Sequence, residues 1–444
     1  MAEAGAAAVK LSLAERVSYG FGDFGFSLAY NMASGFLLLY YTNVVGLPAT
    51  AVGVIFLAAR LMDAVIDVLV GIAVDRTQSR WGRTRPYFLF MAVPYALVFI
   101  AVFAVPDWGV NAQLVYAFLT FKALGILMSL GSIPYTALMP MMTADTGERL
   151  KLSGWRSVGT SASVVMGTAA TMPLVGAFGG DDQQRGFLAV AVLFAALGLI
   201  ATVALFRNCR ERIAAPAGEK KPILPVIGQM LRNRAWLVAF GSCLFYFIRF
   251  GAMMAETPYL AIDVLGKPWL ISIMLPAVSG TLLLSAFIAP PILARTGIRN
   301  GCLAIFAISA ALFLVLPLVE GNTALFLSVY IAAALVTSLT ITAAFTMIAG
   351  TVDYHEWKHG TRNEGVLSAG VSLATKVGMA IGSAGVAFLL GYVNYQPDAV
   401  SEAAQQAIRW SYYGGAAVLL AIQGVVVWFW PMDGMDLTRR PASA

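Results

Sequence analysis

Two carboxylates lie one helical turn apart inside an apolar stretch of this sequence. Asp63 and Asp67 are four residues apart and Arg60 precedes Asp63 by three, so a helix would place all three on one face. Two carboxylates this close repel each other unless something neutralises one of them. A bound Na⁺, which prefers oxygen ligands, would do so, as would one shared proton or a lysine such as Lys376. The spacing therefore predicts a cation-binding site.

Further ionisable residues interrupt other apolar stretches. A charge at the bilayer centre costs at least about 2.5–3.5 kcal/mol on insertion scales, so each such residue predicts a partner or a function. The set comprises Asp23, Arg60, Arg156, Arg249, Glu256 and Lys376. Structural ion pairs between helices would explain single members, but their number favours functional use. If the carboxylates must be occupied before the helices move, cation binding becomes linked to solute binding, and Arg60, Lys376, Arg249 and Glu256 form the coupling network.

The elements that must hold these charges are membrane-spanning helices. Of 444 residues, 59% are hydrophobic and 12% are charged, and the mean hydropathy is +0.78, whereas soluble chains carry about 25% charged residues. This composition excludes an ordinary soluble enzyme. Twelve apolar blocks of spanning length cover residues 17–42, 48–74, 87–105, 111–142, 153–178, 187–206, 236–262, 269–293, 300–318, 323–350, 365–392 and 408–431.

The blocks fall into two sets of six. We expect an N-terminal bundle over 1–206, a basic cytoplasmic linker over 207–235 and a C-terminal bundle over 236–444. A weak echo between the loop at 71–85 and the loop at 293–301 suggests duplication. Two six-helix bundles related by an axis along the membrane normal are the arrangement of the major facilitator fold, in which the substrate binds near the membrane midplane. The predicted fold class is an all-α membrane protein with twelve transmembrane helices.

Charge placement orients the chain. Most of the 29 Lys and Arg residues lie in one alternating set of loops and termini, and only Arg185, Lys267 and Arg409 lie in the other. This positive-inside pattern predicts that both termini are cytoplasmic, with the bilayer rather than nucleic acid as the partner. No cleavable signal peptide precedes the first block. We expect a monomer that requires a small-molecule solute and no cofactor beyond a co-transported H⁺ or Na⁺.

Two motif matches fail their context tests. The pattern HEWKH at residues 355–359 fits a zinc protease helix, but it lies in a predicted loop and the chain has no further histidine for a third ligand. The pattern GFGDFG at residues 20–25 fits a dinucleotide fingerprint, but no strand precedes it. Its glycines favour close helix packing instead, as do Gly159, Gly167, Gly378 and Gly382. We therefore expect neither a metal site nor a catalytic site.

Four segments resemble the glycoside–pentoside–hexuronide:cation symporter family, which includes the melibiose carrier. They are YGFGD at 19–23, the run ARLMDAVIDVLVGIAVDRTQSRWGRTRP at 59–86, IPYTALMPMMTADTGERLKLSGWR at 133–156, and VDYHEWKHGTRNEG at 352–365. The resemblance covers nearly the whole chain. It implies a cation-coupled symporter of a small glycoside-like solute in the bacterial inner membrane, working by alternating access.

The resemblance also implies individual roles. Asp63 and Asp67 match the family's cation-site carboxylates, where Ser129 and Ser132 could add hydroxyl ligands. Asp23 and Arg156 match positions that bind sugar hydroxyls, and Lys376 resembles the lysine that links the two sites. We expect the solute-binding residues to be Asp23, Ser132, Thr136, Arg156 and Lys376. Charged loop residues resemble a cytoplasmic gate: Asp75, Arg76, Arg80, Arg83, Arg85, Asp145, Glu148, Arg149, Asp353, Arg362 and Glu364.

Departures from the family bear on the solute. The melibiose carrier has an aspartate where this chain has Ser132 and tryptophans at Thr136 and near Ile341, so melibiose should not bind in the same way. Loss of the carboxylate at Ser132 favours proton coupling. Two alternatives stay open: a transporter of an amphiphile such as a lysophospholipid, and, from another class, a membrane-embedded enzyme or sensor.

Overall fold

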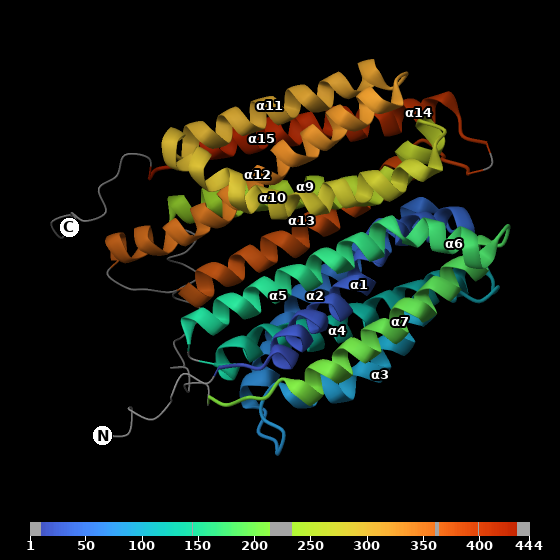
Figure 1. Ribbon diagram of the computed structural model, residues 1–444. Helices are drawn as coiled ribbons and strands as arrows, with labels where there is room; N and C mark the ends of the chain where they lie inside the picture. The colour runs from blue at the N-terminus through green and yellow to red at the C-terminus, as the bar shows by residue number, and fades with distance from the viewer. Residues whose placement is uncertain (1–9, 144, 214–232, 360–363, 398, 433–444) are drawn as a thin grey trace, which may run out of the picture. The chain divides into compact units, whose positions relative to one another are not determined.

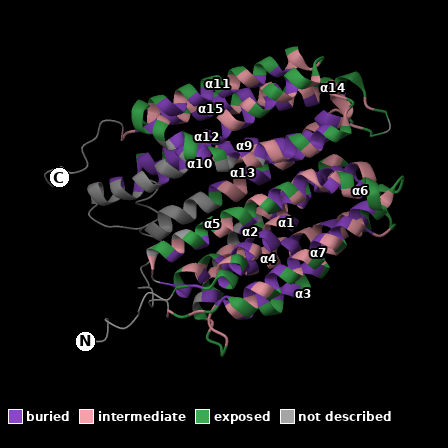
Figure 2. Ribbon diagram, viewed as in Figure 1, coloured by how far each residue is buried: buried purple, intermediate pink, exposed green. Residues whose placement is uncertain are grey.

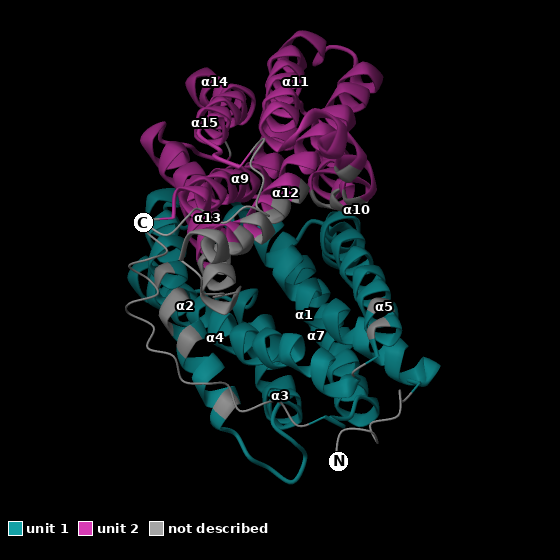
Figure 3. Ribbon diagram, turned by 90° about the vertical axis from the view of Figure 1, so that its left-hand side faces the viewer, with its two compact units in different colours: residues 1–218 teal, residues 219–444 magenta. Residues whose placement is uncertain are grey.

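A computed structural model describes the chain except residues 1–9, 144, 214–232, 360–363, 398 and 433–444. Its secondary structure over the described residues is entirely helical. The chain divides into two compact units, Met1–Gly218 and Glu219–Ala444 (Figure 3). The division falls inside the predicted linker 207–235, whose middle lies outside the described residues, so the predicted linker bounds stay a prediction.

The first unit consists of helices that run alongside one another (Figure 1), and its described residues form six helical segments if α5 and α6 are taken together. Within this unit α1 packs against α5 and α7, α2 packs against α4, and α3 packs against α4 and α7. The elements are α1 (Leu13–Leu39), η1 (Tyr40–Val44), α2 (Ala49–Arg76), α3 (Arg85–Val102), α4 (Val110–Met142), α5 (Thr146–Val164), η2 (Val165–Ala169), α6 (Thr171–Gly179) and α7 (Gln183–Asn208). The bent pair α5–α6 counts as one span.

The second unit repeats the plan. In it α9 packs against α13, and α12 packs against α10 and α11. The elements are α9 (Arg234–Tyr259), η3 (Leu260–Val264), η4 (Pro268–Leu270), α10 (Ile271–Thr296), α11 (Ile298–Val319), α12 (Thr323–His359), α13 (Glu364–Tyr392), α14 (Glu402–Arg409), η5 (Trp410–Gly415) and α15 (Ala416–Trp428). Residues 402–428, which include α14, η5 and α15, form one continuous helical segment, so the described residues of this unit also form six helical segments if η3 and η4 are counted with their neighbours.

Length and composition support the membrane assignment. Within the described ranges, eight helices are apolar and long enough to cross a membrane, or nine if the bent pair counts as one span. The apolar stretches Ala49–Arg60 in α2 and Pro268–Val278 at the start of α10 are shorter by the same measure. Exposed positions recur along α3 and α11 (Figure 2). Large apolar residues are among the exposed ones, for example Phe90 on α3 and Leu318 on α11. Such exposure fits a lipid environment rather than water.

Close helix contacts depend on glycine, as predicted. A Cβ on Gly159 of α5 would overlap the carbonyl oxygen of Gly20 on α1, and one on Gly20 would overlap the carbonyl of Trp155. A Cβ on Gly382 of α13 would likewise overlap the carbonyl of Ile248 on α9. Small residues at these positions let the helix backbones approach directly. The glycines at 20–25 are thus confirmed as packing residues.

The α1–α5 contact generates a stability prediction. We expect Gly159→Ala to lower the stability of the purified protein by about 1–3 kcal/mol, because the added methyl group meets fixed backbone rather than a mobile side chain. Thermal unfolding in detergent, followed by intrinsic fluorescence, measures the change.

The control for this test is Gly154→Ala on the same helix. A Cβ there would meet nothing within 4 Å. Equal melting temperatures for the two variants would show that the close approach of α1 and α5 does not limit stability.

Candidate functional site

The carboxylate of Asp63 is paired from the neighbouring helix. Nζ of Lys122 on α4 lies 2.5 Å from Oδ1 of Asp63 and 3.1 Å from the carbonyl oxygen of Ala59 on α2. Asp63 and Lys122 are only 5% and 6% exposed. Gly125 provides the room for this pair, because a Cβ there would lie 2.9 Å from Oδ1 of Asp63. Two facing helices therefore build a buried ion pair at the first predicted cation ligand.

The second acid has a different partner. Oγ of Ser129 donates to Oδ1 of Asp67 at 2.6 Å, and Ser129 is buried. This second contact lies further along the same two helices, because Asp67 follows Asp63 on α2 and Ser129 follows Lys122 on α4. The guanidinium of Arg60 lies 5.6 Å from the ring centre of Phe121 on α4. The structure thus brings Asp63, Asp67 and Ser129 to one contact between α2 and α4.

Asp23 is the centre of a second polar cluster, between α1 and α5. Nε of Arg156 lies 3.1 Å from Oδ1 of Asp23, and the hydroxyl of Thr160 donates to Oδ2. Ser27 donates to the same oxygen at 3.4 Å. Asp23 is 6% exposed, whereas Arg156 is partly exposed and Thr160 is exposed. Asp23 and Arg156, each predicted as a solute ligand, are therefore in direct contact with each other, and one side of their ion pair is open.

Stacked aromatic rings hold this cluster. The rings of Tyr19 and Tyr135 stack with centroids 4.6 Å apart, and the Tyr135 hydroxyl donates to the Tyr19 carbonyl at 2.9 Å. The Arg156 guanidinium lies 5.2 Å from the centre of the Tyr135 ring. Near Tyr135 on α4, the hydroxyl of Thr136 donates to the carbonyl of Ser132 at 3.0 Å, and Thr136 is exposed. These roles for Ser132 and Thr136 stay predictions.

Two of the predicted charges of the second unit, Arg249 and Glu256, are buried on α9. Arg249 on α9 is 1% exposed, lies 5.3 Å from the centre of the Tyr246 ring, and has no hydrogen-bond partner at Nε or Nη1. Glu256, two turns along, accepts from Ser411 at 3.3 Å. Lys376 is half-buried on α13. Within the described residues neither Arg249 nor Glu256 forms an ion pair, so the coupling network stays a prediction.

Comparison with known proteins identifies the family. The model of the family described as "MFS/sugar transport protein" matches residues 18–434. The chain belongs to this family. The inner membrane symporter YicJ of Escherichia coli is 31% identical to this chain, and the match covers 89% of this chain and 86% of YicJ. The isoprimeverose transporter of Lactiplantibacillus pentosus is 30% identical to this chain, and the match covers 95% of this chain and 89% of that transporter.

Fold comparison agrees with this assignment. The crystal structure of a D-xylose-proton symporter has a TM-score of 0.66 to this chain at 12% identity, covering 94% of this chain and 98% of its own. The major facilitator fold and the resemblance to glycoside–pentoside–hexuronide:cation symporters are confirmed. This MFS/sugar transport protein is a multi-pass inner-membrane protein and not an enzyme. The enzyme alternative is therefore wrong.

The loop between α2 and α3 is fixed by an acid that the sequence did not single out. Glu211, just after α7, accepts from the main-chain nitrogens of Arg83 at 2.8 Å and Thr84 at 2.6 Å, and from the Thr84 hydroxyl at 2.7 Å. Gly82 has φ +107° and no room for a Cβ beside this carboxylate. The Arg85 guanidinium donates to the Phe206 carbonyl at 2.7 Å. Glu211 thus caps the start of α3, where main-chain N–H groups favour an anion.

Glu148 anchors the start of α5. Its carboxylate lies 2.7 Å from Nη2 of Arg16 and 3.0 Å from Nζ of Lys151. Asp145 caps the same helix by accepting from the Glu148 main chain at 2.7 Å, and Nε of Arg149 donates to the Thr143 carbonyl at 2.9 Å. Asp145, Glu148 and Arg149 therefore stabilise the turn before α5 in this structure.

The remaining gate residues divide into two groups. Arg76 and Arg80 are exposed, and the Arg80 guanidinium lies 4.1 Å from the centre of the Trp81 ring. Four others have side chains outside the described residues, namely Asp75, Asp353, Arg362 and Glu364. The side chains of His355 and His359 also lie outside the described residues.

Cys209 directly follows α7 and stands two residues before Glu211. Burial raises the pKa of the Cys209 thiol to about 12, so Cys209 stays a neutral thiol.

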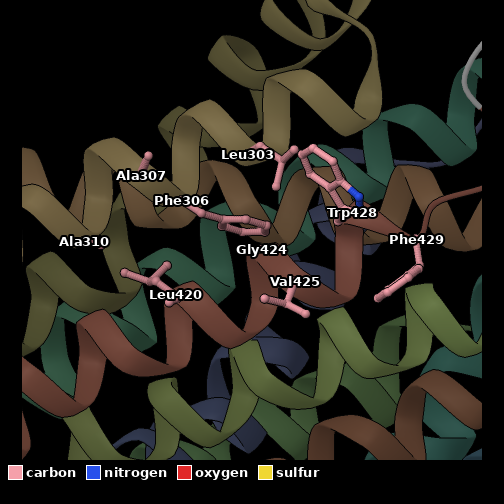
Figure 4. Close-up of a pocket in the computed structure, with 10 residues that line it drawn as sticks. Leu303, Phe306, Ala307, Ala310, Leu420, Gly424, Val425, Trp428 and Phe429 are labelled. Carbon is pink, nitrogen blue, oxygen red and sulfur yellow. The ribbon is translucent and has the colours of Figure 1, made fainter.

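A cavity of about 520 Å³ lies between α11 and α15 of the second unit (Figure 4). Leu303, Phe306, Leu420, Trp428 and Phe429 are among the side chains that line it. Its lining offers almost no hydrogen-bonding groups for a hydroxyl-rich solute. We therefore do not assign it as the solute site.

The Glu211 cap generates a prediction for the cytoplasmic loop. We expect Glu211→Gln to weaken the hold on residues 82–85 by about 1 kcal/mol or more, because the hydrogen bonds lose their charged acceptor. Trypsin should then cleave after Arg80 and Arg83 faster than in the wild type, which mass spectrometry of early fragments measures. Glu402→Gln, at an exposed helix start, is the control. Unchanged cleavage at these arginines would contradict the cap.

Proposed function

We propose that this MFS/sugar transport protein couples the entry of a sugar, glycoside or related small solute to a cation, H⁺ or Na⁺, by alternating access. The observation that carries the proposal is the α2–α4 contact, where two acids in apolar surroundings are engaged by Lys122 and Ser129. Acids in this position within a sugar-transport family favour ion coupling over passive facilitation. The chain acts as a monomer with both termini in the cytoplasm.

The Asp23 cluster supports binding of a hydroxyl-rich solute. A carboxylate, a guanidinium and the exposed Thr160 hydroxyl together offer both acceptors and donors. Arg156 and Thr160 are accessible enough for a solute to share their hydrogen bonds. The relative named as an isoprimeverose transporter supports a glycoside or pentoside as the solute class. Ser132, Thr136 and Lys376 are further proposed ligands of the solute.

Uptake competition tests the solute class. Proteoliposomes containing the purified chain should accumulate a member of a radiolabelled panel of pentosides, glucosides and glucuronides under an imposed ion gradient. Arg156→Lys should raise the half-saturating concentration of that solute about tenfold, because lysine cannot reproduce the planar guanidinium contacts. Competition by lysophospholipids instead of glycosides would support the amphiphile alternative.

Loss of the second acid should separate accumulation from exchange. We expect Asp67→Asn to lower accumulation about tenfold or more, within the range of typical coupling free energies, while solute counterflow continues. The exposed Asp107→Asn serves as control, because Asp107 lies in the loop between α3 and α4. Full accumulation by the Asp67→Asn variant would exclude this acid from ion coupling.

A further inference from the structure

Lys122 occupies the position that a metal ion would use at Asp63. Its ammonium lies between one carboxylate oxygen of Asp63 at 2.5 Å and the main-chain oxygen of Ala59 at 3.1 Å. A carboxylate and a carbonyl one turn apart are the kind of oxygen ligands that hard cations take. Lys122 supplies a positive charge to these two oxygens. Because the ammonium is covalently attached to the protein, it cannot dissociate as a bound ion can.

The surroundings are built to hold this lysine. Asp63 and Lys122 are both more than nine-tenths buried, so water screens the pair little. Gly125, one turn along α4, keeps the space beside the Asp63 carboxylate open. Asp67 is bonded by Ser129 at 2.6 Å, so each of the two acids has its own partner on α4.

We propose that Lys122 is a built-in counter-ion that excludes alkali-metal ions from Asp63 and sets the ion selectivity of the transporter. A sodium ion bound to Asp63 would share the Asp63 carboxylate and the Ala59 carbonyl oxygen with the Lys122 ammonium. The two positive charges would then lie only a few ångströms apart and would repel each other strongly, because water screens this site little. The exchangeable coupling ion is therefore confined to Asp67 and its neighbours. This inference rests on the proposed cation coupling but does not need the identity of the solute.

A purely structural ion pair between α2 and α4 is the competing explanation. Both explanations predict that removal of Lys122 destabilises the protein, because a buried acid loses its partner. Only the counter-ion explanation predicts that Asp63 then acquires an affinity for Na⁺. Sodium binding is therefore the readout that separates them.

The experiment measures ²²Na⁺ binding to the purified full-length chain without any solute. We expect Lys122→Gln to bind ²²Na⁺ about tenfold or more tightly than the wild type, because the carboxylate and carbonyl become available to the ion. Lys122→Arg keeps the charge and should show no gain. The double variant Asp63→Asn with Lys122→Gln should return to wild-type binding, which locates the new site at Asp63. Lys267→Gln, a lysine bonded to Thr323 elsewhere, is the matched control.

A fragile Lys122→Gln variant still tests the proposal. Sodium that binds the folded state stabilises it, so NaCl in place of choline chloride should raise the melting temperature of this variant and leave the wild type unchanged. Equal ²²Na⁺ binding by wild type and Lys122→Gln, or no sodium-dependent stabilisation of the variant, overturns the counter-ion. Failure of the proposed function is distinct, since it requires that no ion gradient drives solute accumulation by the wild type.

Discussion

The fold of the first unit depends on the rule that a charge inside a membrane must be neutralised where it lies. Asp63 meets this rule through Lys122, whose chain crosses from α4 to α2 and ends 2.5 Å from the carboxylate. Neither charge is tolerable there alone, because an unpaired buried ion costs several kcal/mol. The pair therefore fixes the rotation of α2 against α4. If Lys122 acts as the proposed counter-ion, the same pair leaves Asp67 as the carboxylate that is available to a mobile ion.

The charge of Asp23 is also neutralised by a partner, Arg156, but this ion pair is more exposed than the pair at Asp63. Asp23 is buried, but its partners Arg156 and Thr160 reach it from the exposed side of α5. An ion pair that is open on one side can exchange its hydrogen bonds with a solute at little cost, whereas the closed pair at Asp63 cannot. Burial thus divides the intramembrane charges into those that hold the helices and those that remain available for binding.

The sequence predicted those features that depend on the type of a single residue or on the length of an apolar block. Apolar block length predicted the spans, and the small size of glycine predicted the packing role of Gly20 and Gly159. The family resemblance singled out Asp23 and Arg156 as solute ligands, but their direct contact appears only in the structure. Lys122 was visible as a lysine within an apolar block, but its partner was not. The pairing depends on how α2 faces α4, which no local pattern encodes.

Glu211 was missed for a related reason. It stands in a charged run after the last helix of the unit, where solvated side chains are the rule, and its ligands are main-chain N–H groups that carry no sequence signal. The clue that could have found it is Gly82, since a glycine before a helix start often marks a tight approach.

One helix connects these separate sites. Along α4, Lys122 and Ser129 engage the two acids of α2, and Tyr135 stacks on Tyr19 and supports Arg156. Pro134 and Pro140 lie inside the same helix, where each removes a main-chain hydrogen bond and makes bending easier. A shift of α4 would therefore change the surroundings of Asp67 and of the Asp23 cluster together. In the proposed mechanism an ion at Asp67 and a solute at the Asp23 cluster would both bias the position of α4. Ion binding and solute binding would then influence each other without direct contact, and this coupling would be reciprocal by thermodynamic necessity.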